Sequence, residues 1–365
     1  MTDLTQDEVI SKVSSIFDVK DIVINTNDMR LNIEDKDFKS KFVNLARQLE
    51  VRNLVPHLEK SFDGVYIVVT RLPETKRKWL SKSWVPRILF VVTVTMVLID
   101  GYFSTDFVNS LAFVGDPFGM SILYAFSLIG ILGIHESGHL IAAKKHKIKT
   151  SWPFFIPGIP VFGIPTFGAL IQSKGLTVNR DILFDVAIAG PIAGLVIAII
   201  VCIFGAYTAP EVSNELADEL FTNSQLINLG TPILMSITLD IFDKGVSSQV
   251  VMSPILFAAW LGFLITFLNL LPAWQLDGGH MARTLFGKKW HRIATYASMG
   301  VLVVLGYWVM AVFILVLSSR SQDSRPLDDI SPLTKNRKKM FIVVIILGIL
   351  CAPLGADNGL LGILP

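Results

Sequence analysis

The sequence is best understood from the run His135-Glu136-Ser137-Gly138-His139, which lies inside an apolar segment over residues 122–143. Histidines at this spacing share one face of a helix and can bind one zinc ion, with the glutamate between them placed as a general base. An ionisable side chain at the centre of a bilayer costs about 2.5–3.5 kcal/mol. A metal ion in a water-filled cavity would compensate that cost.

The composition indicates a polytopic α-helical membrane protein. Of 365 residues, 52% are hydrophobic and 17% charged, and the mean hydropathy is +0.57. A net charge of +2 is too small to indicate a nucleic-acid partner. Cys202 and Cys351 each lie in an apolar run, which favours packing roles over a disulfide or metal ligation.

The polar first part of the chain, residues 1–80, is predicted to be a small soluble α/β domain. Its helices are expected at 7–16 and 38–49, and its strands at 21–24 and 64–70. A basic linker at 73–82 would connect it to the membrane part.

Hydrophobic spans follow, and their lengths fit a bilayer core of about 30 Å. They are predicted at residues 85–104, 120–143, 182–208, 251–272, 292–318 and 339–355. Lys and Arg before the first span, after the second and after the fourth would share one side, which the positive-inside rule makes cytosolic together with the N-terminus. The acidic connection 209–250 would lie outside.

The connection 319–339 conflicts with this topology, because it is rich in Lys and Arg and yet a six-span count places it outside. Either the rule fails here, or one of the last two spans does not cross the membrane.

The apolar segment 152–171 contains four prolines, which exclude a regular helix. Non-helical backbone at membrane depth is tolerated where protein or a water-filled cavity satisfies it. We therefore interpret the segment as a re-entrant loop or hairpin from the cytosolic side, with an ordinary surface loop as the alternative. Residues 167–172 could form an extended edge.

A catalytic zinc site needs a third protein ligand. The best candidate is Asp277, because Pro272 ends the fourth span and Gly278-Gly279 allows a tight turn back toward the histidines. Two alternatives remain: Asp277 could cap a helix at 278–285, or His280 could be the third ligand. The two histidines could also be polar residues facing the helix bundle without a metal.

Asn269 lies in the fourth span, before Asp277. Its amide could hydrogen-bond a substrate carbonyl or a developing oxyanion, as a catalytic residue would. An interhelical hydrogen bond is an equally good interpretation.

These motifs resemble those of the site-2 protease family, the intramembrane zinc metalloproteases of peptidase family M50. The matching segments are His135-Glu136-Ser137-Gly138-His139, Phe167-Gly168-Ala169, residues 184–194 and Asn269…Pro272…Asp277-Gly278-Gly279. The resemblance covers residues 85–318, the expected protease core, and leaves 319–365 as a loop and last transmembrane segment. The domain at 1–80 looks closest to the plant-chloroplast-like branch of the family.

The resemblance implies that His135, His139 and Asp277 bind Zn²⁺ and that Glu136 activates the water. It also implies that strands within 150–175 hold an extended substrate, and that small residues such as Gly190, Pro191 and Gly194 pack closely around the site.

The expected function is hydrolysis of a peptide bond within or near a transmembrane helix of a membrane-protein substrate in the lipid bilayer. The expected location is a prokaryotic cell membrane, with several spans and a cytosolic N-terminus. A metal-ion transporter and a catalytically silent membrane scaffold are the competing interpretations, because intramembrane His and Asp residues occur in transporters as well.

Overall fold

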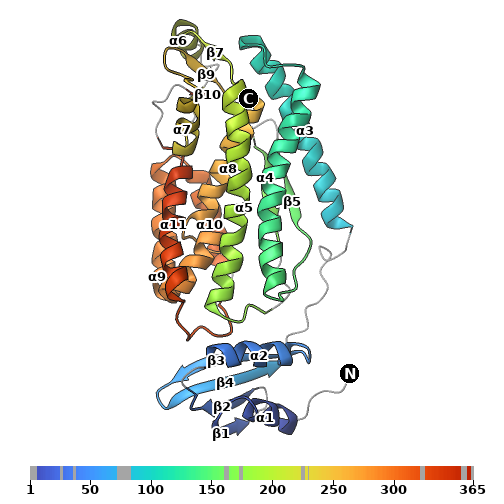
Figure 1. Ribbon diagram of the computed structural model, residues 1–365, viewed down its shortest axis with the longest axis vertical. Helices are drawn as coiled ribbons and strands as arrows, with labels where there is room; N and C mark the ends of the chain where they lie inside the picture. Colours follow the sequence, from blue (N-terminus) through green and yellow to red (C-terminus); the bar gives the residue numbers. More distant parts are fainter. Residues whose placement is uncertain are drawn as a thin grey trace.

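The computed structural model consists of a small N-terminal α/β region, a long helical body and a compact cap at the opposite end of the body, called here the far end (Figure 1). It describes the chain except for residues 1–5, 25–27, 36–37, 72–83, 160–163, 172–175, 223–226, 229, 321–324, 355–359 and 363–365. The predicted basic linker at 73–82 lies outside the described residues.

The N-terminal α/β region is an antiparallel sheet with the strand order β1-β2-β4-β3 and two helices. Its elements are α1 (Gln6–Ser14), β1 (Val19–Ile24), β2 (Met29–Ile33), α2 (Lys39–Glu50), β3 (Leu54–Ser61) and β4 (Gly64–Arg71). Alternate residues of β2 and the apolar face of α2 bury their side chains in one core, which contains Leu31, Phe42, Leu45 and Ile67. The helices and strands predicted within 1–80 are present, and β2 and β3 are additional.

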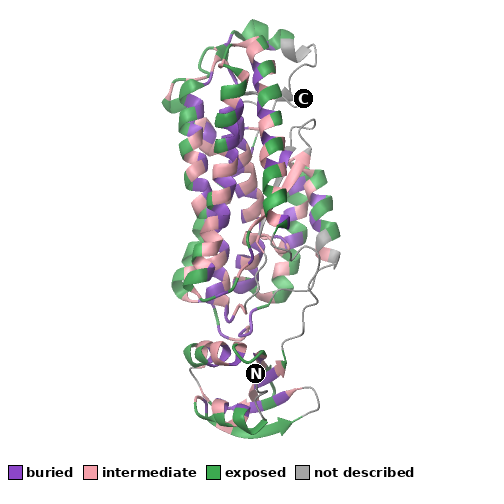
Figure 2. Cartoon of the chain, turned by 90° about the vertical axis from the view of Figure 1, so that its right-hand side faces the viewer, coloured by how far each residue is buried: buried purple, intermediate pink, exposed green. Residues whose placement is uncertain are grey.

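Three helices are long and apolar enough to cross a membrane, and a fourth apolar helix is shorter. The three are α3 (Val85–Leu111), α4 (Pro117–Lys145) and α5 (Arg180–Thr208), and the shorter one is α8 (Pro254–Leu270). Large apolar side chains are exposed on their outer faces, such as Phe103 and Ile200, while the inward faces are buried (Figure 2). This is the surface that lipid requires, and the chain is an α-helical membrane protein.

The fifth predicted span, 292–318, is not a single helix. The structure has α9 (Asp277–Val304), kinked at Gly287, and then α10 (Trp308–Arg320), which packs against α9. Between them Gly306 has φ 86°, a left-handed conformation that glycine adopts at no steric cost. The chain therefore folds back at Gly306, inside an apolar run that offers no polar turn residue.

The fold-back removes the conflict over the positively charged connection. After α10, residues 325–334 lie beside the N-terminal α/β region, where the Lys39 ammonium donates to the Pro332 carbonyl at 3.0 Å. Helix α11 (Lys335–Cys351) then leads toward the far end (Figure 1). The charged connection thus shares the end of the body that carries Lys144 and Lys145, as the positive-inside rule requires.

The proline-rich segment forms a pair of antiparallel strands, β5 (Phe154–Ile159) and β6 (Ile164–Leu170). Phe155 of β5 packs edge-to-face on Phe90 of α3, with 5.1 Å between the ring centroids. The expectation of non-helical backbone is therefore confirmed, and the re-entrant position stays a prediction.

The far-end cap is a small sheet with the strand order β7-β9-β10-β8 and two short helices (Figure 1). Its elements are β7 (Glu211–Val212), α6 (Asn214–Thr222), β8 (Ile227–Asn228), α7 (Ile233–Ile241), β9 (Gln249–Val251) and β10 (Leu360–Gly362). β10 follows α11 in the chain and lies between β8 and β9, which ties the segment after the last helix to the long connection after α5.

The core of the helical body lies between α4, α5 and α8. Small residues allow these helices to approach closely: a Cβ on Gly262 of α8 would lie 3.0 Å from the Cβ of Ala198 in α5. Cys202 and Cys351 are both buried and free, which confirms that they are packing residues.

The N-terminal α/β region contacts the end of the helical body through an interface that we call the junction. Its backbone part is a hydrogen bond from the Leu58 amide of β3 to the Leu327 carbonyl at 2.9 Å. Its charged part includes Arg47 of α2, which donates to the His146 carbonyl at 2.8 Å, and Lys39, which pairs with Asp181 at 2.7 Å. The junction therefore holds the N-terminal region against the ends of α4 and α5.

Candidate active site

The two histidines and the glutamate of the opening motif lie on α4, within the part of this helix that packs against α5. His135 and Glu136 are buried, with 5% and 6% of their surface exposed. The helix places His135 and His139 one turn apart on the same face, as the spacing predicts.

Asp277 reaches the histidines because the chain turns tightly after α8. A Cβ on Gly278 would lie 2.1 Å from the Leu270 carbonyl oxygen, and one on Gly279 would lie 2.3 Å from the Trp274 carbonyl oxygen. Both positions therefore exclude a side chain. Asp277 is the first residue of α9, and the residue before it, Leu276, makes no side-chain cap. The turn, rather than helix capping, accounts for the position of Asp277.

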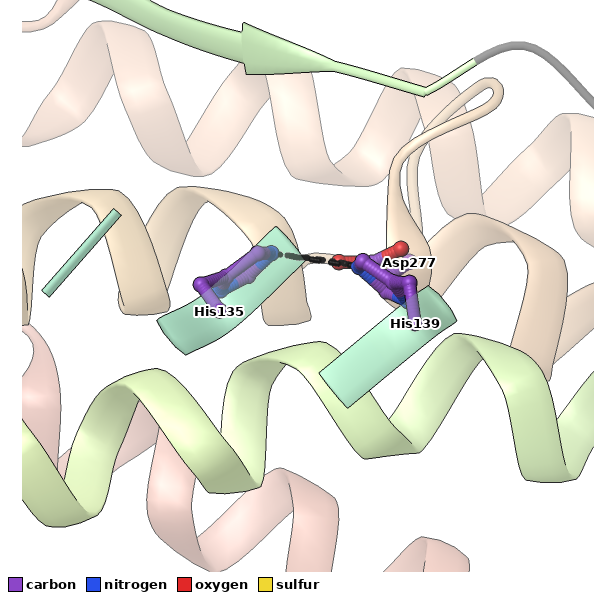
Figure 3. Close-up of side chains that lie close together, drawn as sticks. All are labelled: His135, His139 and Asp277. Atoms are coloured by element: carbon purple, nitrogen blue, oxygen red, sulfur yellow. Dashed lines mark hydrogen bonds and ion pairs between the residues drawn. The ribbon is translucent and has the colours of Figure 1, made fainter. Parts of the chain in front are cut away.

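The three side chains converge on one point (Figure 3). The Nε2 atoms of His135 and His139 are 3.2 Å apart, and they lie 3.4 and 3.3 Å from the same Asp277 oxygen, Oδ2. Donor atoms about 2.0–2.1 Å from a tetrahedral zinc ion are about 3.3 Å apart. Two imidazoles and a carboxylate are also a donor set that zinc accepts. The cluster therefore fits Zn²⁺ in both spacing and chemistry.

The orientation of His139 is fixed by a backbone group of α5. The His139 Nδ1 atom lies 2.8 Å from the Val186 carbonyl oxygen. A carbonyl can only accept, so Nδ1 carries the proton and the Nε2 lone pair points at the cluster. The sequence gives no direct signal for this contact, because any residue at position 186 supplies a carbonyl.

Glycines of the α4–α5 seam leave room for the histidine rings. A Cβ on Gly190 would lie 2.1 Å from His139 Nε2, and one on Gly194 would lie 3.1 Å from His135 Nδ1. On the α4 side, a Cβ on Gly138 would lie 2.4 Å from the Ala189 carbonyl oxygen. These distances give a physical basis for the close packing that the family resemblance implies.

The cluster faces a cavity of about 670 Å³. Glu136, Asn269 and His280 line it together with the cluster, and the β5–β6 hairpin forms part of its wall. The cluster of metal-ligating groups found among the described residues is His135, His139 and Asp277, and it does not include His280. Asn269 makes no interhelical hydrogen bond with the residues that the structure describes, so its predicted catalytic role stays open.

Sequence reasoning did not place Thr177 or Arg325 in the cavity wall. Thr177 follows the hairpin in the chain, and Arg325 precedes α11, yet both line the same cavity as Glu136. Neither belongs to a local motif, and only the fold-back at Gly306 brings Arg325 to this end of the body.

Comparison with known proteins identifies the family. The sequence profile of peptidase family M50 matches residues 123–313, which is more than half of the chain. A curated relative from Arabidopsis thaliana, "Probable zinc metalloprotease EGY1, chloroplastic", is 30% identical over 253 residues, 64% of this chain and 45% of the relative. "Probable zinc metalloprotease EGY2, chloroplastic" from the same plant is 32% identical over 194 residues, 51% of this chain and 34% of the relative.

The chain thus spans less than half the length of these relatives. Their names describe chloroplast proteins, which gives no support to the predicted prokaryotic cell membrane. No solved structure matches the chain. The profile covers the His-Glu-Ser-Gly-His helix, the seam glycines and the Asp277 turn, and the chain belongs to peptidase family M50, the site-2 protease family.

Proposed function

We propose that the chain is an intramembrane zinc metalloprotease that hydrolyses a peptide bond within or near a transmembrane helix of a membrane-protein substrate. The observation that carries this proposal is the convergence of His135, His139 and Asp277 beside Glu136, in a cavity next to a helix long enough to span a membrane. Membership of the M50 family supports the same activity.

In this proposal His135, His139 and Asp277 hold the metal ion. Bound zinc supplies Lewis-acid activation of a water molecule and of the scissile carbonyl. Glu136 accepts the proton of the attacking water and later delivers it to the leaving amine. The hydrogen bond from His139 Nδ1 to Val186 keeps the imidazole in the tautomer that a metal ligand needs.

Asn269 is the proposed donor to the carbonyl oxygen of the substrate, because its amide group lines the cavity without a partner among the described residues. A donor aimed at the developing oxyanion lowers the barrier of acyl transfer.

The β5–β6 hairpin is the proposed binding site for the substrate backbone. Phe154, Ile156 and Ala169 of the hairpin line the cavity that contains the cluster. A transmembrane helix hides its carbonyls in hydrogen bonds, so it must unwind before hydrolysis, and an unwound segment can add as a strand to a sheet edge. The hairpin would then be re-entrant, as predicted, with its free backbone groups satisfied by the substrate or by water in the cavity.

The membrane topology follows from the distribution of charge. We place the N-terminal α/β region, as a soluble domain over 1–80, on the cytosolic side together with the basic ends of α4 and α11. Residues 85–318 form the protease core, with the α9–α10 fold-back in place of a fifth single span, and 319–365 hold the connection and the last helix. A prokaryotic cell membrane stays a prediction.

The test is cleavage of a model transmembrane substrate by the purified full chain in detergent. Wild type, wild type with a zinc chelator, Glu136→Gln and Ser137→Ala run side by side, because Ser137 neighbours Glu136 but bonds only the Gly133 carbonyl of its own helix among the described residues. We expect chelation to abolish cleavage and Glu136→Gln to slow it by about 10²–10⁴-fold with one zinc still bound per chain. Ser137→Ala should cleave normally.

Undiminished cleavage by Glu136→Gln would refute the mechanism. Zinc-loaded wild type that cleaves no member of a substrate panel would instead favour the silent scaffold.

A further inference from the structure

We propose that Arg325 binds a carboxylate of the substrate, so that the protease prefers membrane proteins with an aspartate or glutamate on the junction side of the scissile bond. This inference rests on the proposed protease function and deepens it, because it names a feature of the substrate.

Arg325 lines the part of the cavity that points toward the N-terminal α/β region. Ala143 and Ile148 line the cavity too, and Ala143 is four residues beyond His139 toward the end of α4. Four residues of helix rise about 6 Å. The cavity therefore continues past the cluster of His135, His139 and Asp277 to the junction, where Thr177 and Arg325 belong to its wall.

Few of the residues that line the cavity are ionisable. The ionisable residues other than Arg325 that line the cavity, among those the structure describes, are His135, Glu136, His139, Asp277 and His280. The rest of the described cavity wall is mostly apolar and includes Ile148, Ile156 and Leu183. Among the described residues of the wall, Arg325 is the one that carries a permanent positive charge.

The backbone beside Arg325 is held firmly. The Leu327 amide donates to the Thr177 carbonyl at 3.0 Å, and the Asp328 amide donates to the Val178 carbonyl at 2.7 Å. The Leu327 carbonyl in turn accepts from Leu58 of β3. Residues 327 and 328 thus bridge β3 to the segment that follows the hairpin, which fixes the position from which Arg325 extends.

A partly buried ion pair strengthens this anchor. Arg283 of α9, only 3% exposed, donates to both carboxylate oxygens of Asp329 at 3.2 and 2.7 Å. Arg180 of α5 donates to the same carboxylate at 3.0 Å. Because Arg283 is buried, losing this pair would destabilise the structure, which favours a fixed position of the connection.

Arg325 has no carboxylate partner among the described residues, in contrast to four other arginines near this end. Arg47 pairs with Glu50, Arg180 and Arg283 share Asp329, and Arg337 pairs with Asp185. The charged neighbour of Arg325 is His57 on β3, whose pKa is lowered by burial and further by the Arg325 charge. The Arg325 guanidinium is therefore free to form a bidentate pair with a carboxylate that enters the cavity.

The experiment measures kcat/KM for a substrate series in which one residue on the junction side of the scissile bond is Asp, Asn or Lys, scanned position by position. Wild type, Arg325→Gln, Arg325→Glu and the control Lys149→Gln are compared; Lys149 is an exposed cation near the same end, outside the cavity wall. An exposed charge-assisted hydrogen bond contributes about tenfold in rate or affinity.

We expect wild type and Lys149→Gln to prefer Asp over Asn by about tenfold at one position. Arg325→Gln should bring this ratio near one, and Arg325→Glu should prefer Lys. Equal rates for Asp and Asn in wild type, or an Asp preference that survives in Arg325→Gln, would overturn the inference while leaving the protease intact. Absence of zinc-dependent cleavage of every substrate would overturn the proposed function itself.

Discussion

The α4–α5 seam and the junction are both contacts between separate parts of this protein, but they are built differently. In the seam, glycines let a neighbouring backbone or ring approach so closely that a single added methyl group has no room, as at Gly190 against His139. In the junction, long charged side chains such as Arg47 and Lys39 reach across to backbone carbonyls and carboxylates, around an apolar core and a backbone hydrogen bond to Leu327.

The difference predicts how each region responds to amino-acid substitutions. A close-packed interior cannot accept added volume unless the neighbouring groups shift. An added side chain in the seam should therefore displace the groups that pack there. Each contact through a long side chain contributes a modest free energy, so such contacts can be lost one at a time. The histidines of the cluster lie in the close-packed seam, whereas the junction combines such side-chain contacts with a buried apolar core that includes Ala143, Ile148 and Leu327.

The largest effect is expected for removal of the carboxylate of the cluster. Asp277→Ala should reduce zinc content well below one per chain and abolish cleavage, because the two histidines alone leave the ion without its third protein ligand. Asp116→Ala is the matched control, since Asp116 also begins a helix but only caps it through the Gly119 amide. Metal analysis of both purified variants measures the zinc content. Full zinc occupancy in Asp277→Ala would show that Asp277 is not a ligand.

A methyl group in the seam should come next. In Gly190→Ala the new Cβ would lie 2.1 Å from His139 Nε2, so the imidazole must shift and the zinc affinity should fall by about 10–100-fold. Gly130→Ala on α4 meets nothing within 4 Å and controls for the loss of a helical glycine. Competition with a chelator measures the affinity. Equal zinc affinity in the two variants would show that the seam is softer than its distances indicate.

A smaller, graded effect is expected at the junction. Arg47→Ala removes hydrogen bonds to Glu50 and to the carbonyls of Leu176 and His146. The contacts between the N-terminal region and the body should weaken by about 1–3 kcal/mol, with zinc content unchanged. Hydrogen exchange of α2 and β3 in the full chain reports the loosening, and Arg52→Ala, which alters an exposed arginine just after α2, is the control. Unchanged exchange in Arg47→Ala would mean that apolar contacts alone hold the junction.

The smallest effect is a pH dependence at His57. Its pKa is lowered from the ordinary value of 6.5, chiefly by burial and then by Arg325. Because the unfolded state binds the proton more readily, the stability of the N-terminal region should be complete above about pH 6.5 and should decline as the pH falls below that value. His57→Gln should flatten this dependence. Thermal unfolding of the region, followed by limited proteolysis at several pH values, makes the comparison; the same slope in both proteins would rule out His57 as its source.

Local signals in the sequence predict the metal cluster well. Helical spacing brings His135 and His139 together, and the glycine pair after Asp277 indicates the turn that the structure contains. Apolar segments likewise predict the positions of α3, α4, α5 and α8, and the spacing of apolar residues predicts the main helices of the N-terminal region.

Features that depend on distant contacts could not be predicted in this way. The fold-back at Gly306 lies in an uninterrupted apolar run, so periodicity gives one span where the structure has two helices. The Val186 carbonyl that orients His139 has no side-chain signature. Arg325 is remote in sequence from every residue of the cluster, and only the packing of the connection against Thr177 and Val178 brings it to the cavity.

The far-end cap joins segments that are far apart in the chain. Its sheet is completed by β10, which pairs with β8 and β9 although the four helices α8 to α11 come between them in the chain. Pairing between segments so far apart in the chain is slow, because closing a long loop costs entropy before the contact stabilises anything. Until β10 pairs, β8 and β9 lack this neighbour and present open strand edges. We therefore expect closure of this sheet to be a late step in the folding of the chain.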